Sequence, residues 1–455
     1  MKRQLKSYFY GGIHPSDGTD KLLSNQTPIK YYVPKRIEIS MMQSIGHVSK
    51  CIVDIGDRVT LGQLIGIPQE FGTANIHASV PGIILDIIKV DDEHDGVYDV
   101  VVIETDNNFD INELYHNKDY SKQLKDISSY SRETLISSMK DGGIIGMGGA
   151  GFPTHIKYET NKTIDTVLIN AAECEPYLTC DHRIMLEFPF EIINGVNLMI
   201  KAANANKATI CLEDNKADAA KKLQEILENS NLPIKVKLLA TRYPQGGERQ
   251  LIQAVIKKEI PIGKLPAELG VIVSNVATAK ALADMTFNET PLITRCITIT
   301  GFVNKPSNYM VPIGTLLNDL ISESGGISID GDNKIIHGGP MTGTCIASNS
   351  NGNGLIGGVL KISSGIVVLG DEEIIESPCI RCGRCERVCP AGLAPFKIDF
   401  AAIENDLSLC DKLYATECIS CGACSYVCPA RRELAWRITI AKNEIFNQRH
   451  KNGGK

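Results

Sequence analysis

The sequence lacks any apolar run that could cross a lipid bilayer. Its uninterrupted apolar runs, such as Val100–Ile103 and Ile366–Leu369, are far shorter than the roughly 18 residues that a membrane-spanning helix needs. The N-terminal stretch Met1–Lys6 is basic but is not followed by an apolar segment, so a secretory signal is not expected. The sequence therefore predicts a cytoplasmic chain without a transmembrane helix.

Aromatic residues are also scarce, at 6% of the 455 residues, and they suggest no sticky interaction surface. The formal net charge is −6, and no nucleic-acid partner is expected. A hydrophobic content of 43% and a charged content of 22% are typical of a soluble globular protein. The length favours three or four domains.

Most of the 15 cysteines lie in one short region, between Cys379 and Cys428. In a cytoplasmic chain such thiols are better explained as metal ligands or redox groups than as disulfides. The run C-x-x-C-x-x-C-x-x-x-C-P occurs at 379–390 and again at 418–429. This run is the bacterial ferredoxin pattern, and two copies make coincidence improbable, so the sequence predicts two 4Fe-4S clusters.

The order of the cysteines also predicts which thiolates bind which cluster. The first three of each run lie in a tight turn that brings their sulfurs to a common point, whereas the fourth lies on the following helix and reaches the other cluster. The predicted ligands are Cys379, Cys382, Cys385 and Cys428 for one cluster, and Cys418, Cys421, Cys424 and Cys389 for the second.

Zinc is the competing metal for these thiolates. Structural zinc sites usually combine two separated cysteine pairs without a third cysteine two residues further on, so zinc is disfavoured. Cys410 lies between the two runs without a matching partner and is predicted to be a packed free thiol. Two clusters in one fold would conduct single electrons, which predicts an electron-transfer protein rather than a hydrolase or a transferase.

The charge is distributed unevenly along the chain. Residues 379–455 contain 12 Lys and Arg against 8 Asp and Glu, a net charge of +4, so the remaining residues carry −10. A basic face near the clusters could steer an acidic redox partner, and the alternative is an ordinary solvated surface. Residues 436–455 could likewise form either an amphipathic docking helix or a solvated tail, and the sequence leaves both interpretations open.

The N-terminal region predicts a small β domain. Between residues 35 and 105, short strands alternate with Gly-Asp and Pro-Gly turns, a pattern that resembles the flattened β-barrel of biotinyl and lipoyl carrier domains. Such carriers present a modified lysine at a hairpin tip, but the corresponding segment, Glu70–Asn75, contains no lysine. The fold is therefore expected without the swinging-arm function.

The middle of the chain predicts an α/β domain followed by a β-rich module. Apolar segments at Thr166–Asn170, Ala208–Leu212 and Val271–Val273 indicate buried strands, and Lys216–Asn229 has helical apolar spacing. The strand predicted at Arg295–Gly301 opens a unit that resembles a β-grasp module.

A glycine-dense turn at Asp141–Lys157 precedes the strand at Thr166. Glycines let backbone amides approach an anionic group, and Lys157 would supply a compensating charge, but a tight turn without a ligand explains the glycines about as well. No strong strand leads into the turn, unlike an ordinary Rossmann fingerprint. Glu173 and Glu175 follow a buried strand directly, where open α/β sheets bind ligands, which favours a ribose and pyridine-ring site over an unremarkable surface loop.

These motifs together resemble the RnfC family, whose members belong to the Rnf complex, a ferredoxin:NAD oxidoreductase complex also known as the Rsx electron transport complex. The resemblance covers nearly the whole chain. The segments that carry it are Gly11–Pro15, Gly146–Lys157, Asn170–Arg183, Tyr243–Gly246, Gly338–Met341 and both cysteine runs. The central part is also similar to the flavin- and NADH-binding subunit of respiratory complex I, whose loop reads G-R-G-G-A-G-F-P-T-G-x-K.

The predicted fold is multidomain, of α/β and α+β class. Its expected units are an N-terminal segment (1–34), a barrel-sandwich hybrid β domain (35–110), an α/β flavin- and NADH-binding domain (130–290), a β-grasp module of SLBB type (295–365), a helical two-cluster ferredoxin-type domain (370–440) and a basic tail (441–455).

The resemblance to the complex I subunit implies roles by position. FMN would lie against Gly146, Gly148 and Lys157, with Asn170 and Glu173 near its ring and ribityl chain. NADH would stack on the Phe152 ring, and the Glu175 carboxylate would hold one of its riboses. Two further residues, Glu248 and Asn275, fall on matching motif positions. The sequence departs from that family at Met147, Ala172 and Gly247, where the family has arginine, aspartate and glutamate.

The Rnf resemblance implies exchange of electrons between NAD and ferredoxin within a membrane assembly that moves Na+ or H+. NADH gives up two electrons as hydride whereas each cluster accepts one, so FMN is the sensible converter, and no general acid or base is predicted. The expected partners are the other Rnf subunits, NADH and, indirectly, ferredoxin, with this chain docked peripherally on the cytoplasmic face of the membrane. Two alternatives remain: a soluble flavin and iron-sulfur reductase of a metabolic pathway such as a corrinoid one, and a flavin-free iron-sulfur scaffold, which the three departures favour.

Overall fold

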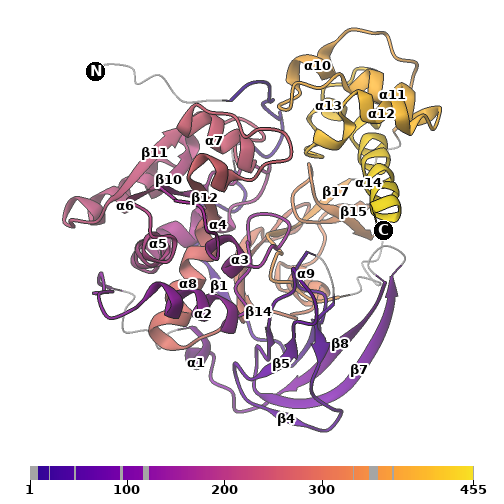
Figure 1. Ribbon diagram of the computed structural model, residues 1–455. Coiled ribbons are helices and arrows are strands. Elements are labelled where there is room, and N and C mark those ends of the chain that lie inside the picture. The colour runs from indigo at the N-terminus through magenta and orange to yellow at the C-terminus, as the bar shows by residue number, and fades with distance from the viewer. Residues whose placement is uncertain are drawn as a thin grey trace.

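The structure is a computed structural model that describes residues 9–19, 21–45, 48–92, 96–115, 122–331, 333–347, 357–370 and 374–453. Figure 1 shows four parts: an α/β part on the left, a barrel part at the lower right, a mixed sheet between them and a helical cysteine-rich part at the upper right. Within the described ranges, no helix combines the length and the apolar character that spanning a membrane would require.

The barrel part consists of two small antiparallel sheets around one hydrophobic core. Its elements are β2 (Arg36–Ser40), β3 (Lys50–Cys51), β4 (Arg58–Val59), β5 (Leu64–Ile67), β6 (Ile76–His77), β7 (Gly82–Asp92), β8 (Gly96–Thr105) and the short helix α1 (Ile111–Tyr115) that follows. The sheets have the orders β2-β8-β7-β4 and β3-β5-β6. Ile37 and Ile39 of β2 are fully buried whereas Glu38 between them is not, because successive side chains of a strand point to opposite faces.

The α/β part is built on a parallel four-stranded sheet of order β11-β10-β9-β12. Its elements are α2 (Arg132–Asp141), α3 (Thr154–Tyr158), β9 (Thr166–Ala171), α4 (Cys180–Glu187), α5 (Pro189–Ala203), β10 (Lys207–Glu213), η1 (Asp214–Lys216), α6 (Ala217–Glu228), β11 (Ile234–Leu239), α7 (Glu248–Ile256), η2 (Pro266–Leu269), β12 (Val271–Asn275) and α8 (Val276–Asn288). Val167 and Ile169 belong to the core on one face of the sheet and Leu168 to the core on the other. The buried strands and the helix that the apolar patterns predict here are therefore confirmed.

The mixed sheet has the order β1-β14-β13-β17-β15-β16 and shares a hydrophobic core with the helix at Leu317–Glu323. Its elements are β1 (Lys30–Tyr31), β13 (Thr294–Gly301), β14 (Ser307–Pro312), α9 (Leu317–Glu323), β15 (Asn333–His337), β16 (Thr344–Ala347) and β17 (Gly365–Gly370). The edge strand β1 comes from the predicted N-terminal segment and pairs in parallel with β14. The segment predicted at 1–34 is thus joined to a sheet formed nearly three hundred residues later.

The cysteine-rich part is helical. Its elements are α10 (Arg384–Val388), α11 (Pro395–Ile403), α12 (Leu407–Lys412), η3 (Ala415–Glu417), α13 (Ala423–Tyr426) and α14 (Leu434–Gly453). The predicted boundary between residues 440 and 441 is wrong, because α14 runs through it and buries Ala441 and Ile445 in the same core as Ile398. Lys442, expected in a basic tail, donates a hydrogen bond to the carbonyl of Cys418 at 2.6 Å. Cys410 is fully buried in this core, as predicted.

Residues 9–19, which we call the strap, join the α/β part to the cysteine-rich part. The amide of Gly12 donates to the carbonyl of Val388 at 2.8 Å. Ile13 and Tyr243 exchange two backbone hydrogen bonds, of 2.8 and 2.9 Å. The strap therefore bonds to both parts with adjacent residues.

Gly11 is the glycine of the strap whose missing side chain lets the strap lie against the cysteine-rich part. Its φ is +74°, and a Cβ there would lie 2.8 Å from the carbonyl oxygens of Val388 and Cys389. We expect Gly11→Ala to speed hydrogen exchange at the Gly12 and Ile13 amides by about tenfold or more, because the strap must move away from the cysteine-rich part. Exchange measured by mass spectrometry would check this.

Gly56→Ala is the matched control for that variant. Gly56 has a φ of +90°, but a Cβ there would meet no described atom within 4 Å. The control carries the backbone strain without the collision, so equal exchange in the two variants would contradict the docking role of Gly11.

Candidate functional site

Four of the nine predicted flavin- and NADH-site residues lie at or just beyond the carboxyl ends of β9 and β12, where open parallel sheets bind ligands: Asn170, Glu173, Glu175 and Asn275. Asn170 ends the predicted first strand, and Asn275 ends β12 beside it. The Asn275 amide nitrogen lies 3.4 Å from the Asn170 carbonyl and donates to Asp181 Oδ2 at 2.8 Å. Its oxygen accepts from the Ala277 amide at 2.7 Å and so caps α8.

The glycine loop between α2 and α3 packs directly on Asn275. The Gly146 amide donates to the Phe152 carbonyl at 2.8 Å, which closes the loop at its base. A Cβ on Gly148 would lie 2.6 Å from the Asn275 side-chain nitrogen, whereas a Cβ on Gly149 would meet no described atom within 4 Å. The loop thus presents backbone, without side chains, toward open space. A helix leads into the loop, in agreement with the absence of a strand signal.

Met147 stands where the complex I family has an arginine, and the structure places another arginine behind it. The Arg295 guanidinium, from β13, is 3% exposed and donates to the Met147 carbonyl at 3.3 Å. Its other terminal nitrogen lies 3.7 Å from the Met147 sulfur. A buried positive charge is therefore present at the loop, supplied by a different strand.

The loop that leads into α7 brings Glu248 to Lys157 of α3. Lys157 Nζ lies 3.3 Å from Glu248 Oε1 and 3.2 Å from the Val273 carbonyl. Asn170 donates to the Gly246 carbonyl at 2.8 Å, which holds this loop against the end of β9. Lys157 is thus a partly exposed cation on the floor of the site.

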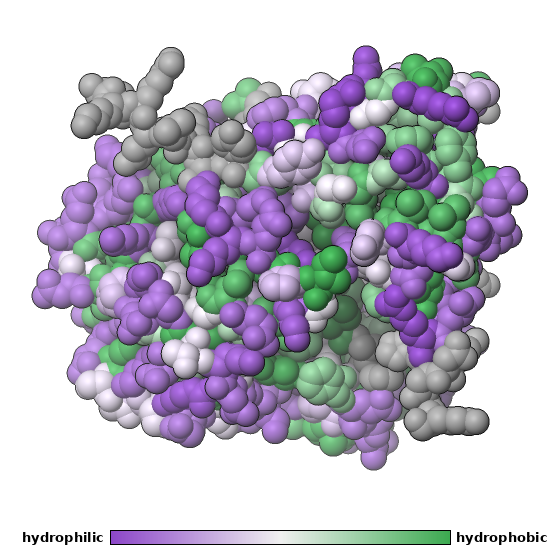
Figure 2. All heavy atoms as spheres, turned by 45° about the horizontal axis from the view of Figure 1, so that its top comes forward, coloured by the Kyte–Doolittle hydropathy of each residue, from purple (hydrophilic) through white to green (hydrophobic). Residues whose placement is uncertain are grey.

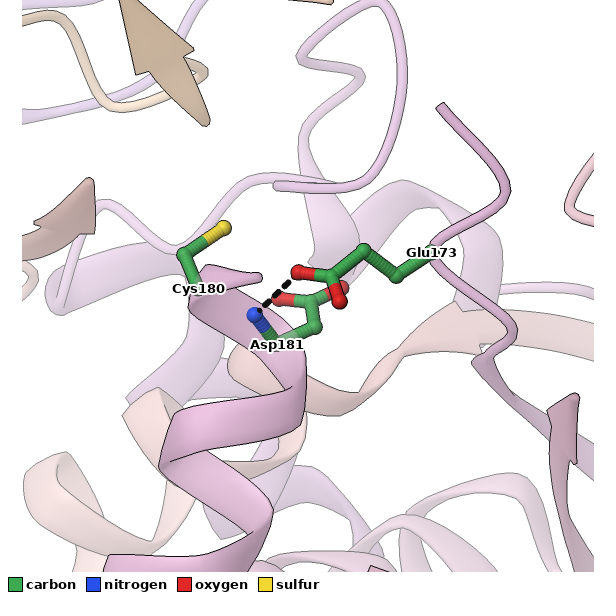
Figure 3. Close-up of side chains that lie close together, drawn as sticks. All are labelled: Glu173, Cys180 and Asp181. Carbon is green, nitrogen blue, oxygen red and sulfur yellow. Dashed lines mark hydrogen bonds between the residues drawn. The ribbon is translucent and has the colours of Figure 1, made fainter. Parts of the chain in front are cut away.

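Glu173 is turned toward the start of α4, as Figure 3 shows. Its carboxylate accepts from the Asp181 amide at 2.6 Å, and it lies beside the Asp181 carboxylate. Asp181 Oδ1 is buried and has no hydrogen-bond partner among the described residues. Ligand atoms of Glu173, Cys180 and Asp181 all lie within 4.8 Å of one another.

Burial raises the pKa of Glu173 to about 7, with the Asp181 carboxylate adding to the effect and the ammonium groups of Lys21 and Lys216 opposing it. A raised carboxyl pKa stabilises the fold at low pH and ceases to do so as the pH rises from 4.5 through about 7. We expect thermal stability to fall over this range by on the order of 2 kcal/mol, and Glu173→Gln to remove the dependence.

Melting curves recorded by circular dichroism on either side of this range would check the expectation. Glu228→Gln, on the exposed end of α6, is the control and should keep the wild-type pH dependence. A Glu173→Gln profile parallel to the wild type would contradict the protonation of Glu173.

Two buried lysines fix the backbone of this loop. Lys21 Nζ donates to the carbonyls of Glu173, Glu175 and Leu178, at 2.6, 2.7 and 2.7 Å. Lys216 Nζ donates to the Ala172 carbonyl at 2.7 Å. Sequence reasoning missed both lysines, because neither belongs to a motif and only the folded chain brings them to the end of β9.

Glu175 contacts a different segment from the other predicted residues. Its carboxylate accepts from the Met341 amide at 3.1 Å and from the Thr342 hydroxyl. Burial raises the pKa of Glu175, and these two hydrogen bonds oppose the shift. A Cβ on Gly422, in the second cysteine run, would lie 2.9 Å from the Met341 carbonyl. Glu175 therefore contacts Met341, which in turn lies against the cysteine-rich part.

Tyr243 makes the second connection to that part. Its hydroxyl donates to the Cys421 carbonyl at 2.7 Å. Tyr243 and Ala423 are buried in one small core, to which Cys174, Met341 and Cys421 are partly buried neighbours. Figure 2 shows one face of the molecule, with a hollow near its middle and hydrophobic side chains along the edge of the hollow. The second cysteine run thus contacts the Tyr243 side chain of the α/β part.

The structure brings the cysteines together in the two predicted sets. One cavity is lined by Cys379, Cys382 and Cys385 of the first run and by Cys428 of the second. In the other set, burial, with the neighbouring thiols of Cys418 and Cys389, raises the pKa of Cys421 to about 12. Burial and the same neighbours also raise the pKa of Cys424. Each fourth cysteine therefore lies with the opposite run.

Four family models match successive stretches of the chain. They are the RnfC barrel sandwich hybrid domain (7–108), the Nuo51 FMN-binding domain (139–284), the SLBB domain (296–344) and the 4Fe-4S dicluster domain (378–432). An FMN-binding domain joined to a 4Fe-4S dicluster domain defines an electron-transfer protein of the flavin and iron-sulfur class.

Curated relatives, each of them one subunit of an oxidoreductase complex, match over most of their own length. The chain is 38% identical over 398 residues to its relative in the proton-translocating ferredoxin:NAD(+) oxidoreductase complex of Clostridium ljungdahlii, covering 86% of this chain and 83% of that one. It is 38% identical over 454 residues to the relative in the Na(+)-translocating complex of Acetobacterium woodii, covering 97% and 98%. The relative in the ion-translocating oxidoreductase complex of Rhodobacter capsulatus is 33% identical over 408 residues, covering 87% and 75%. The chain belongs to this family, the RnfC family.

Among solved structures, the chain aligns with a chain of the NAD+-reducing [NiFe]-hydrogenase in the H2-reduced state. The TM-score is 0.48 and the identity 18%, over 72% of this chain and 67% of that one.

Proposed function

We propose that this chain is the electron-transferring RnfC component of an ion-translocating ferredoxin:NAD oxidoreductase complex. It exchanges electrons between NADH, FMN and two 4Fe-4S clusters, and it docks peripherally on the cytoplasmic face of the membrane against the other subunits. The observation that carries the proposal is the contact of the Tyr243 hydroxyl with the Cys421 carbonyl at 2.7 Å. This hydrogen bond joins the α/β part, which contains the glycine loop, directly to the second cysteine run.

The glycine-loop site suits FMN in the chemistry of its donors. Gly146 closes the loop through its own amide, and the backbone of Gly148 and Gly149, together with the Lys157 cation, would suit a phosphate group. Asn170 and Glu173 lie at the end of β9, where the ring and the ribityl chain would meet them. Asn275 braces the glycine loop from below, and it holds Asp181 as well.

The same site leaves Phe152 and Glu175 for the dinucleotide. Phe152 is half-buried at the end of the glycine loop and offers a ring for stacking. Glu175 offers a carboxylate for a ribose, and Glu248 keeps Lys157 oriented. FMN, when bound, accepts a hydride and releases electrons one at a time, so the residues need only bind and orient. None of them has to act as a general acid or base.

The eight clustered cysteines would hold two clusters in series. We assign Cys379, Cys382, Cys385 and Cys428 to an outer cluster, because their cavity lies where the Cys382 side chain is exposed. We assign Cys418, Cys421, Cys424 and Cys389 to an inner cluster, because this set adjoins Tyr243 and Met341. Electrons would pass between the flavin and the inner cluster, and the outer cluster would meet the partner subunit.

Anaerobic purification of the whole chain tests this proposal. We expect iron and acid-labile sulfide for two 4Fe-4S clusters, one FMN, and bleaching of the flavin absorbance by NADH. Stoichiometric zinc without sulfide would refute the cluster assignment. Full clusters without FMN, even after reconstitution with it, would instead favour the flavin-free scaffold.

A further inference from the structure

The face of the second cysteine run around Cys421 is covered by other parts of the chain. The Tyr243 hydroxyl donates to the Cys421 carbonyl at 2.7 Å, and Ala423 is fully buried in one core with Tyr243. A Cβ on Gly422 would lie 2.9 Å from the Met341 carbonyl oxygen. This face of the second run therefore forms a contact within the chain.

The same face of the first cysteine run is open. Its corresponding residues are Cys382, Gly383 and Arg384, and both Cys382 and Arg384 are exposed. The Cys382 carbonyl accepts from the Arg387 guanidinium at 3.3 Å, and a Cβ on Gly383 would lie 3.5 Å from the same guanidinium. Within the described part of the chain, no other segment covers this face as the α/β part covers the second run.

The backbones of the two runs are nevertheless alike. The second run has Ser420 and Ala423 where the first has Arg381 and Arg384. The φ angles at Arg381 and Ser420 are nearly equal, at +55° and +52°, and the glycine two residues further on is left-handed in both runs. The turn that brings the thiols together therefore does not need the arginines, so another role must account for them.

Positive charge and apolar surface gather at the open face. Residues 379–390 contain three arginines against one carboxylate, whereas residues 418–429 contain no charged residue. Among the described residues, Arg381 and Arg384 form no ion pair. Ile380, which is 68% exposed, lines the same cavity as these two arginines. An exposed apolar side chain beside unpaired arginines is typical of a surface that binds a protein of opposite charge.

We propose that the face formed by Ile380, Arg381 and Arg384 docks an electron-transfer protein whose own surface is acidic. This inference rests on the proposed function and names the chemistry of the partner that meets the outer cluster. In each encounter one electron passes between the outer cluster and the redox centre of the partner, so that one is oxidised as the other is reduced and no atom is transferred. A membrane surface is also anionic, but it carries no redox centre, and this face surrounds the cavity of the four cysteines.

A reduced acidic ferredoxin is the probe that tests this surface. Stopped-flow absorbance would measure the second-order rate at which it reduces the anaerobically purified holoprotein. The double variant Arg381→Ser/Arg384→Ala copies the residues of the second run, so it should keep its iron and the resonance signal of the outer cluster. At low ionic strength we expect its rate to be about tenfold below the wild-type rate, because electrostatic steering is lost. The difference should vanish at about 1 M salt, where the Debye length is about 3 Å.

Two further variants separate charge from other causes. Arg381→Lys/Arg384→Lys keeps both charges and should keep the wild-type rate and its fall with rising salt. Lys221→Ser/Lys235→Ala removes two positive charges from exposed positions on α6 and β11 of the α/β part. This control should also keep the wild-type rate, because those charges lie outside the cysteine-rich part.

Equal ferredoxin rates in the wild type and in Arg381→Ser/Arg384→Ala, with full iron content, would overturn this inference and leave the proposed function standing. A wild-type rate that does not fall as salt rises would overturn it without any variant. Binding to phosphatidylglycerol vesicles that is lost in the double variant, with no change in the ferredoxin rate, would assign the face to a lipid surface instead. A wild-type holoprotein without acid-labile sulfide would refute the proposed function together with the inference.

Discussion

Replacing Cys421 with alanine is expected to stop electrons at the flavin. Cys421 is a predicted ligand of the inner cluster, and its carbonyl accepts the Tyr243 hydroxyl at 2.7 Å from the α/β side. NADH should still bleach the FMN absorbance at the wild-type rate, because the glycine loop is untouched. Reduction of the outer cluster should then slow by at least about a hundredfold, since electron transfer loses its intermediate carrier. Stopped-flow absorbance with electron paramagnetic resonance would measure both steps.

The fourth cysteines make this expectation specific. Cys389→Ala should lose the same resonance signal as Cys421→Ala although it belongs to the first run, because its thiol lies close to Cys421 and Cys424. Cys428→Ala should lose the signal of the outer cluster, whose cavity it lines. Cys410→Ala is the control, a buried thiol outside both sets that should leave the iron content unchanged. Loss of the outer signal on removal of Cys389 would refute the crossed assignment.

Substituting valine for Gly148 is expected to abolish retention of FMN. The new Cβ would lie 2.6 Å from the Asn275 side-chain nitrogen, so the glycine loop must lift from the end of β12. A lifted loop misplaces the backbone amides that would meet the phosphate, and losing two or three such hydrogen bonds to a charged group weakens binding on the order of a hundredfold or more. Flavin content after purification and the dissociation constant of added FMN would measure the loss.

The fold should survive this substitution, because the collision is confined to the glycine loop and to Asn275. If Asn275 also lost its hydrogen bond to the Ala277 amide, the missing cap of α8 would cost about 1 kcal/mol. Iron content and the circular dichroism spectrum should therefore match the wild type. Gly370→Ala is the control, since a Cβ there lies 3.5 Å from the nearest described side chain, that of Ile329. A Gly148→Val protein with normal FMN content would show that the loop does not carry the flavin.

Local patterns in the sequence were sufficient to predict strands, turns and cysteine runs within the separate parts of the chain. The strand at Thr166–Asn170 and the turns between 35 and 105 depend on neighbouring residues alone, because apolar runs and Gly or Pro turns act within a few residues. The two cysteine runs could be recognised in the same way, because the spacing of cysteines that a cluster needs is a local feature of the sequence. The boundary at 440 and 441 failed because burial of Ala441 and Ile445 depends on helices packed across the fold.

By its motifs and its resemblance to known families, the sequence determined that the chain has an FMN-binding domain and a 4Fe-4S dicluster domain, and it predicted the residues that would hold those cofactors. Only the tertiary structure decided how those sites are joined: Lys21 reaches the end of β9 from the strap side, Tyr243 reaches Cys421, and Phe71 reaches Phe152. Each of these contacts links residues more than 80 positions apart. A motif indicates what one segment of the chain can bind. A contact between distant segments forms only after packing has placed both of them, so no local sequence pattern could predict it.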